Sequence, residues 1–235
     1  MAERKRIPVE SRLTRLSKTM TWLLRHGAEQ HQLAMRKDGY VCVQDLLHHP
    51  KLRGVTFLTL EEIVKQDQKQ RFHLLHEPSS TETGTSSHLG SWWIRANQGH
   101  SLRNVEVDLK RILQADEIPM AVHGTTLQAW SLIEQQGLSR MKRNHIHLAQ
   151  GKPGANVISG MRNSSQVLIY INVAKAMQAG IKFYLSANGV VLTEGNDYGI
   201  LEPCYFEKVE MINIKADHIV VPVPQVEEAG AQGTL

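Results

Sequence analysis

The stretch LTRLSKTMTWLLRHG, residues 13–27, decides how the first part of the chain folds. Its apolar residues recur three or four positions apart, which is the spacing of one face of an α-helix. These residues are Leu13, Leu16, Met20, Leu23 and Leu24. We therefore predict an amphipathic helix from about residue 10 to residue 26. The helix ends on Arg25-His26-Gly27, where Gly27 is a typical helix stop.

The segments after this helix complete the pattern of a winged helix, which is a helix-turn-helix with a β-hairpin. We expect a strand at 39–43, helices at 44–49 and 59–67, and strands at 71–75 and 92–95. The later helix opens with the capping box Thr59-Leu60-Glu61-Glu62. Winged helices dock nucleic acid, and they also serve as protein–protein modules.

The second half of the chain predicts a lobe of another kind, rich in short strands. We expect strands at 120–123, 146–148, 167–171, 183–185, 189–192 and 205–211, with helices at 126–136 and 174–179. This order is typical of an α+β fold and differs from a βαβ repeat. The chain has no GxGxxG after a strand and no GxxxxGK[ST], which argues against a Rossmann fold and a P-loop.

The division into lobes follows from these patterns. We place the first lobe at residues 1–100, a connector at 101–117, the second lobe at 118–215 and a disordered tail at 216–235. The chain has 235 residues and is 41% hydrophobic, which is enough for a core in each lobe. The net charge of +4 comes from the first half, so a polyanion would bind there, although a charged, solvated surface is the simpler explanation.

Cysteine content and hydropathy exclude several classes of protein. Cys42 and Cys204 are far apart, so neither a zinc site nor a disulfide framework is indicated. No apolar run approaches the ~20 residues of a membrane span. The first residues, MAERKRIPVE, lack the apolar core of a secretory signal. We expect a monomer inside the cell, cytoplasmic or nuclear, without membrane contact.

Two basic segments of the first lobe could bind phosphate. Arg25 and His26 offer a guanidinium fork and an imidazole at a helix end, where they would also simply complement the helix dipole. Ile94-Arg95-Ala96-Asn97-Gln98-Gly99-His100-Ser101 ends a strand with a dense set of donors. Loops of this kind bind phosphate or ribose, and they are equally common as solvated turns.

Three segments of the second lobe could bind a small ligand. His123-Gly124-Thr125 lies where a strand gives way to a helix, and the backbone N–H groups there are free to meet an anion. His145 and His147 alternate on one strand face, but no third ligand completes a metal site. Ser186-Ala187-Asn188-Gly189-Val190 predicts a type I′ hairpin turn, and a good turn is also its simplest explanation.

Together these segments resemble the RNA 2′-phosphotransferase family (KptA) of tRNA splicing, across roughly residues 12 to 211. The matching pieces stand in the family's order. They are Leu24-Arg25-His26-Gly27, Asp38-Gly39-Tyr40-Val41, Lys69-Gln70-Arg71-Phe72, residues 94–101, His123-Gly124-Thr125, residues 145–149, Gly160-Met161-Arg162 and residues 186–190. The resemblance implies a winged-helix lobe that holds RNA and an ADP-ribosyltransferase-like lobe that holds NAD.

The resemblance also assigns roles to residues. The catalytic residues it implies are Arg25, His26, Arg95 and Arg162. The NAD-binding residues are His123, Gly124, Thr125, His145, His147, Ser159, Gly160, Asn188, Gly189 and Val190. The RNA-binding residues are Arg25, His26, Lys69, Arg71, Gln98 and His100. Related transferases carry a glutamate where Val190 stands, which matters less when the acceptor is an ionised phosphate.

The reaction that the family implies moves an RNA 2′-phosphate to NAD in two steps, through an ADP-ribosylated RNA phosphate. Its products are 2′-OH RNA, ADP-ribose 1″,2″-cyclic phosphate and nicotinamide. NAD is a co-substrate and no metal is needed; His26 is a candidate proton donor for the leaving oxygen. The alternatives are an ADP-ribosyltransferase acting on terminal nucleic-acid phosphates or proteins, and a winged-helix regulator that senses NAD without turnover.

Overall fold

A computed structural model of the chain describes residues 11–78, 90–151, 161, 164–212 and 219–221. The chain divides into two compact units, Met1–Asp108 and Leu109–Leu235. Within these residues, helices alternate with small antiparallel sheets, which confirms the predicted α+β class.

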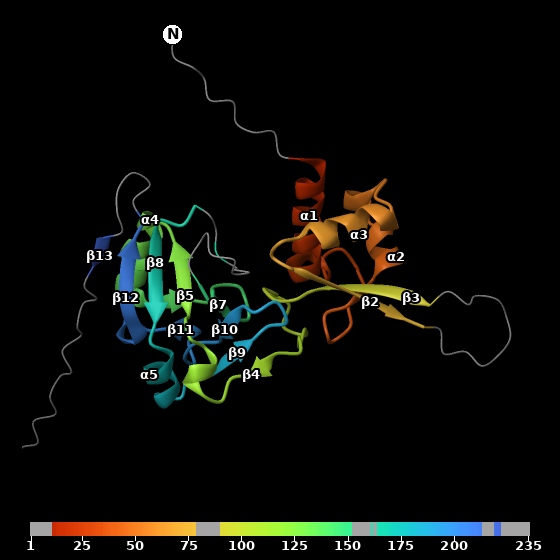
Figure 1. Cartoon of the computed structure of the whole chain (residues 1–235). Helices are drawn as coiled ribbons and strands as arrows, with labels where there is room; N and C mark the ends of the chain where they lie inside the picture. The colour runs from red at the N-terminus through yellow and green to blue at the C-terminus, as the bar shows by residue number, and fades with distance from the viewer. Residues whose placement is uncertain (1–10, 79–89, 152–160, 162–163, 213–218, 222–235) are drawn as a thin grey trace, which may run out of the picture. The chain divides into compact units, whose positions relative to one another are not determined.

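Unit 1 packs helices against one three-stranded sheet (Figure 1). Its helices are α1 (Arg12–Trp22), η1 (Leu23–Gly27), α2 (Val43–His48), η2 (Pro50–Leu52) and α3 (Phe57–Gln66), and its strands are β1 (Val41–Cys42), β2 (Phe72–Glu77) and β3 (Ser91–Ala96). The sheet order is β1-β3-β2, with both pairs antiparallel. The core contains Met20, Leu23 and Leu24 of the opening helix, which are fully buried as their spacing predicts.

The opening helix ends at Gly27, as predicted. The glycine is needed there for close packing, however, and not because the helix ends in a left-handed conformation. Regular α-helix stops at Trp22, and Leu23–Gly27 winds as a π-helical turn. The next residue, Ala28, is still right-handed at φ −57° and ψ −47°. A Cβ on Gly27 would lie 2.5 Å from Cζ3 of Trp22, so glycine is required there by the close packing of the indole.

The predicted capping box at the start of α3 is wrong. Helix α3 begins at Phe57, and its N-cap is Thr56, whose hydroxyl accepts a hydrogen bond from the Thr59 backbone N–H at 3.3 Å. Thr59 is therefore inside the first turn of the helix. Two threonines three positions apart both satisfy the sequence rule for a cap, and the pattern favoured the wrong one.

Unit 2 contains two four-stranded sheets and one two-stranded sheet (Figure 1). The first has the order β13-β12-β8-β5 and the second β4-β9-β10-β7. Their strands are β4 (Lys110–Arg111), β5 (Val122–Thr125), β7 (Ile146–Leu148), β8 (Val167–Ile171), β9 (Phe183–Leu185), β10 (Val191–Thr193), β12 (Phe206–Met211) and β13 (Ile219–Val221). The two-stranded sheet joins β6 (Leu138–Ser139) and β11 (Ile200–Leu201).

Helices and 3-10 turns fill the remaining connections of unit 2. They are η3 (Ala115–Glu117), α4 (Leu127–Gln136), α5 (Val173–Gln178) and η4 (Pro203–Tyr205). Thr126 caps α4 by accepting from Ala129 N, and Gly137 ends it at φ +84°, both as predicted. One buried cluster takes side chains from both larger sheets, including Ile169 of β8 and Phe183 of β9. The short strands β4, β6, β11 and β13 were not predicted.

The segment that the sequence describes as a connector, residues 101–117, contributes buried side chains to both units. Leu102 and Val105 are buried beside Ala28 in unit 1. Lys110 and Arg111 pair with β9, and Ile112 joins the core of unit 2. The boundary between the units falls between Asp108 and Leu109.

Candidate active site

The loop after β3, Asn97–Ser101, brings the basic residues of unit 1 together. Asn97 anchors its start, because its backbone N–H donates to Arg71 O at 2.8 Å and its amide to Gln70 O at 2.7 Å. The end of the loop is tied to the opening helix. The Ser101 backbone N–H donates to Arg25 O at 3.0 Å, and Ser101 Oγ lies 2.9 Å from His26 Nδ1.

The Arg25 guanidinium lies directly against the middle of this loop. A Cβ on Gly99 would be 3.2 Å from Cζ, Nε and Nη1 of Arg25, and Gly99 itself has φ +90°. Arg25 is only 9% exposed, so its charge is held inside the unit rather than spread into solvent. A guanidinium desolvated in this way binds an anion more strongly than an exposed one.

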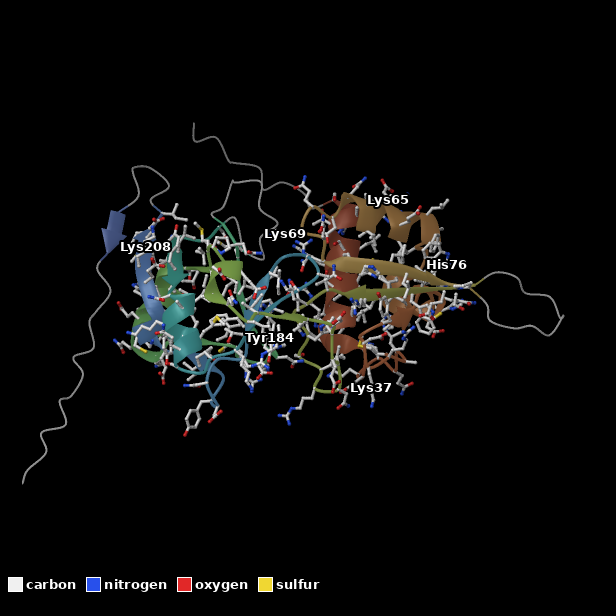
Figure 2. The ribbon with its side chains drawn as sticks, turned by 60° about the horizontal axis from the view of Figure 1, so that its bottom comes forward. Lys37, Lys65, Lys69, His76, Tyr184 and Lys208 are labelled. Carbon is white, nitrogen blue, oxygen red and sulfur yellow. The ribbon has the colours of Figure 1, made fainter. Side chains whose placement is uncertain are left out.

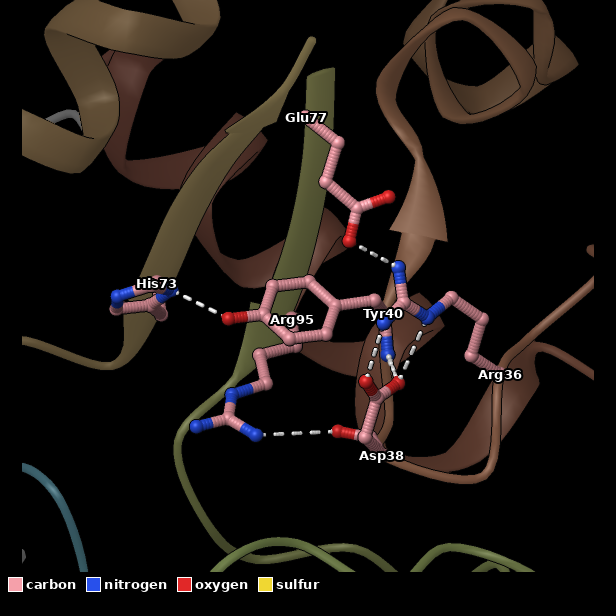
Figure 3. Close-up of polar contacts among 6 residues, drawn as sticks. All are labelled: Arg36, Asp38, Tyr40, His73, Glu77 and Arg95. Carbon is pink, nitrogen blue, oxygen red and sulfur yellow. Dashed lines mark hydrogen bonds and ion pairs between the residues drawn. The ribbon is translucent and has the colours of Figure 1, made fainter. Parts of the chain in front are cut away.

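Arg95 reaches the same region from β3. It lies opposite His73 of β2 in the sheet, and its Cζ is 4.8 Å from the centre of the Tyr40 ring (Figure 3). Its Nη1 donates to Asp38 O at 3.3 Å. Within the part of the chain that the structure describes, the buried Nε of Arg95 has no hydrogen-bond partner. The hydrogen-bonding capacity of this guanidinium is therefore only partly used within unit 1.

A third segment, Asp38–Tyr40, closes the cluster. A Cβ on Gly39 would lie 3.5 Å from His100 Nε2, so this turn packs against the loop after β3. Gln98 and His100 are 6% and 3% exposed, which excludes the solvated turn that the sequence left open. We name the residues Arg25, His26, Arg95, Gln98, His100 and Ser101 the arginine–histidine cluster.

Lys69 and Arg71 lie on the turn before β2, next to Asn97. The Asp67 carboxylate holds this turn through two contacts with Arg71. One carboxylate oxygen pairs with the Arg71 guanidinium, and the other accepts a hydrogen bond from the Arg71 backbone N–H at 2.6 Å. Partial burial, aided by the charge of Arg71, lowers the pKa of Lys69. Lys69 and His76 are at opposite ends of β2 (Figure 2). The basic turn is thus attached to the same end of the hairpin as Arg95.

Unit 2 contains a cavity of about 330 Å³ at the C-terminal end of β5. Four predicted residues line it: His123, Gly124, Thr125 and His147. His123 Nδ1 is 3.1 Å from His147 O and donates to it. Burial, and to a lesser extent the charge of Arg143, lowers the pKa of His123, so its imidazole is neutral and its Nε2 is an acceptor.

Gly124 lets Met161 and Ser165 pack directly against the β5 backbone at the wall of this cavity. A Cβ there would collide with Met161 Cγ and would lie 2.6 Å from Ser165 Oγ. The cavity wall also includes Arg143, Ser164 and Ser165, which sequence reasoning missed. These residues belong to no motif, and only the fold brings them beside β5.

Other predicted residues of unit 2 lie outside the lining of this cavity. His145 packs edge-on against Tyr184, with ring centres 6.0 Å apart, and burial lowers its pKa. Asn188 is 4% exposed and Val190 is fully buried. The turn that holds them is connected to the cavity wall through Gln150, whose amide donates to Gly189 O at 2.9 Å.

The predicted type I′ turn at Asn188-Gly189 is wrong. A type I′ turn needs positive φ at both central residues, and here only Gly189 has it, at +74°. Instead Ser186 N donates to Val190 O and Gly189 N to Ser186 O, which makes a three-residue hairpin loop. Strand β10 consequently begins at Val191 rather than Gly189.

Three predicted residues, Ser159, Gly160 and Arg162, lie outside the described residues.

Across the residues that are described, no group of three histidine, cysteine or acidic side chains is placed to hold a metal ion. A search of the same residues finds no helix with the length and apolarity to cross a membrane.

Comparison with known proteins identifies the family. The sequence model described as "RNA 2′-phosphotransferase, Tpt1 / KptA family" matches residues 11–195. The chain therefore belongs to the RNA 2′-phosphotransferase family, as the resemblance of its motifs predicted.

Individual relatives are similar over most of their length. The tRNA 2′-phosphotransferase 1 of Danio rerio is 46% identical over 206 residues, which cover 86% of this chain and 88% of that protein. The tRNA 2′-phosphotransferase of Saccharomyces cerevisiae is 36% identical, over 78% of this chain and 80% of its own. A probable RNA 2′-phosphotransferase of Rhizobium johnstonii is 32% identical, over 77% and 89%.

Proposed function

We propose that this protein transfers a 2′-phosphate from tRNA to NAD and releases nicotinamide, 2′-OH RNA and ADP-ribose 1″,2″-cyclic phosphate. The observation that carries the proposal is the arginine–histidine cluster, where Arg25 and His26 contact the loop that follows Arg95, in a family of RNA 2′-phosphotransferases. Relatives from fish and yeast are named for tRNA as the substrate. Unit 1 then acts as a winged-helix RNA lobe and unit 2 as an ADP-ribosyltransferase-like NAD lobe.

The chemistry consists of two displacements. An oxygen of the RNA 2′-phosphate bonds to the anomeric carbon of the nicotinamide ribose as nicotinamide leaves. The 2″-hydroxyl of that ribose then bonds to phosphorus, and the RNA 2′-oxygen leaves with a proton. The phosphate is already an ionised nucleophile, so the first displacement needs positioning more than a strong base.

The residues of unit 1 fit the demands of a phosphate. Buried Arg25 and the Arg95 guanidinium, whose hydrogen-bonding capacity is only partly used, stabilise charge on the five-coordinate phosphorus of the second displacement. His26, held by Ser101, is our candidate to give the leaving oxygen its proton. We keep Arg162 as a further phosphate ligand and Lys69, Arg71, Gln98 and His100 as RNA contacts.

The cavity of unit 2 fits part of NAD. Its walls combine the neutral imidazole of His123, the backbone at Gly124 and the hydroxyl groups of Thr125, Ser164 and Ser165. NAD supplies the activated ribose carbon, and the protein supplies donors, acceptors and a water-poor pocket. We retain His145, His147, Ser159, Gly160 and the Asn188-Gly189-Val190 turn as further NAD-binding candidates.

A product analysis tests the proposal. The protein is incubated with NAD and a short RNA that carries one internal 2′-phosphate, and the products are identified by mass spectrometry. We expect nicotinamide and the cyclic phosphate in equal amounts, and no nicotinamide when the RNA lacks its 2′-phosphate. Absence of nicotinamide release contradicts turnover and favours an NAD-sensing binder. ADP-ribose that stays on the acceptor, without cyclic phosphate, favours an ADP-ribosyltransferase.

Substitution of Arg95 with lysine tests the role of the guanidinium. Lysine keeps the charge but loses the planar fork that binds two phosphate oxygens, so we expect turnover to fall about 10–100-fold. ADP-ribosylated RNA should accumulate, because the second displacement loses more stabilisation than the first. The control is Arg53→Lys, at an exposed position of the same unit. Full turnover of the Arg95 variant, without accumulated ADP-ribosylated RNA, would contradict the proposed binding of two phosphate oxygens by the guanidinium.

Substitution of Gly124 with alanine tests the cavity. The added methyl group has no room beside Met161 and Ser165, so it must displace them into the cavity or move the β5 backbone. We expect the KM for NAD to rise about tenfold, in the range of mild overpacking, while the KM for RNA stays the same. The control, Gly180→Ala, adds a methyl group in open space on unit 2 at φ +89°, so it shows the effect of backbone strain without a clash. An unchanged KM for NAD would place the NAD site elsewhere.

A further inference from the structure

The guanidinium of Arg95 is held by very few contacts of its own. Within the described residues, only Nη1 makes a hydrogen bond, and its 3.3 Å distance to Asp38 O is long. The buried Nε atom makes none. The main restraint on the direction of the guanidinium is therefore the Tyr40 ring, 4.8 Å from Cζ.

Tyr40 in turn is fixed firmly, as Figure 3 shows. Its hydroxyl lies 2.6 Å from Nδ1 of His73, and the two rings pack edge to face with centres 5.9 Å apart. The Arg36 guanidinium lies 5.3 Å from the Tyr40 ring centre and forms ion pairs with Asp38 and Glu77. The tyrosine is thus locked at its hydroxyl and along its ring.

The burial of Tyr40 differs from that of a core residue. It is 5% exposed, yet it belongs to none of the apolar clusters found among the described residues, although its neighbour Val41 does. Polar or charged side chains lie over its ring or bond its hydroxyl: Arg36, His73 and Arg95. A phenylalanine or leucine would fill this space as well if packing were the only purpose.

The protonation states of the pair keep extra charge away from Arg95. Burial raises the pKa of Tyr40, and it lowers the pKa of His73, with a further lowering from the charge of Arg95. Both groups are therefore neutral near pH 7. The Tyr40 hydroxyl and Nδ1 of His73 share one hydrogen bond between two neutral groups.

We propose that Tyr40 and His73 are positioning residues that fix the Arg95 guanidinium for the reacting phosphate. The proposal rests on the proposed function, in which Arg95 binds that phosphate. It gives a role to the Asp38-Gly39-Tyr40-Val41 motif. The carbonyl oxygen of Asp38 fixes the position of Nη1 of Arg95, and the Tyr40 ring fixes the orientation of the guanidinium plane. The Nη2 atom is left for a phosphate oxygen.

A double-mutant cycle tests whether Tyr40 acts through Arg95. The enzymes compared are wild type, Tyr40→Leu, Arg95→Lys and the double variant, with kcat and KM measured on 2′-phosphorylated RNA and NAD. Tyr40→Leu should lower kcat about tenfold, with little change in the KM for NAD. In the double variant, the loss should equal that of Arg95→Lys alone, because residues that act through one another are not additive. Additive losses would overturn the proposal.

Rescue at His73 supplies a readout that a purely structural role would not move. The side-chain amide of asparagine can form a hydrogen bond where Nδ1 does, whereas leucine cannot. We expect His73→Leu to lower kcat several-fold and His73→Asn to recover most of it. Tyr40→Phe, which keeps the ring and loses the hydroxyl, should match His73→Leu. If Tyr40→Leu does not fold, Tyr40→Phe with Arg95→Lys completes the same cycle. Tyr198→Phe, at an 88% exposed position, is the control.

RNA binding separates failure of this proposal from failure of the proposed function. If wild type releases no nicotinamide, the proposed function fails, and the affinities for RNA with and without its 2′-phosphate become the readout. Positioning of Arg95 then predicts that Tyr40→Leu reduces the preference for phosphorylated RNA as much as Arg95→Lys does. An unchanged preference in Tyr40→Leu would overturn the proposal in that case also.

Discussion

Replacing Gly99 with alanine is expected to lower kcat/KM for 2′-phosphorylated RNA by about tenfold, and by up to about a hundredfold if Arg25 rotates away. The new Cβ would lie 3.2 Å from three atoms of the Arg25 guanidinium, which is already enclosed and 9% exposed. Arg25 must therefore shift by a few tenths of an ångström or rotate away. Catalytic groups misplaced by about 1 Å can cost on the order of a hundredfold in rate.

The matched control for this substitution is Gly54→Ala in the same unit. Gly54 has φ +78°, close to the +90° of Gly99, but a Cβ there would meet nothing within 4 Å. Both variants carry the same backbone strain of about 1 kcal/mol. The comparison therefore isolates the contact with Arg25. Equal kcat/KM values for the two variants, with melting temperatures also equal, would show that Gly99 does not position Arg25.

Apolar spacing predicted most elements of the fold. Leu13, Leu16 and Met20 place α1 because burial on one face requires their period, whatever the rest of the chain does. The π-helical turn at Leu23–Gly27 could not be predicted in this way. This turn depends on which carbonyl oxygen accepts the hydrogen bond from each backbone N–H, and on the Trp22 ring that packs beside Gly27. Neither feature leaves a mark on the spacing of the apolar residues.

Residue type and family resemblance single out Arg25, His26 and Arg95 as candidates, but not the groups that hold them. The contact between His26 and Ser101 joins residues 75 positions apart, so no local motif reveals it. The contact of Tyr40 with His73 depends on the register that sets His73 opposite Arg95 in the β2–β3 pair. Arg143 reaches the cavity of unit 2 from a loop without regular structure, where sequence periodicity is uninformative.

Replacing Phe183 with alanine is expected to destabilise unit 2 by about 3–5 kcal/mol, the usual cost of deleting a buried aromatic ring. Phe183 is fully buried at the start of β9, in the cluster that takes side chains from both larger sheets. Its carbonyl also accepts from Ile112 N at 2.9 Å, and the substitution leaves that bond in place. The loss therefore reports the ring alone. Urea unfolding followed by circular dichroism measures it.

Two further variants decide whether the loss comes from the cavity left behind. Phe183→Leu keeps most of the apolar volume and should cost clearly less than alanine, because the cost grows with the volume left empty. Leu132→Ala removes an apolar side chain that is 59% exposed on α4, and it should change stability by less than about 0.5 kcal/mol. If Phe183→Ala costs no more than Leu132→Ala, the ring does not connect the two sheets. The cluster would then depend on the β8 residues Val167, Ile169 and Ile171.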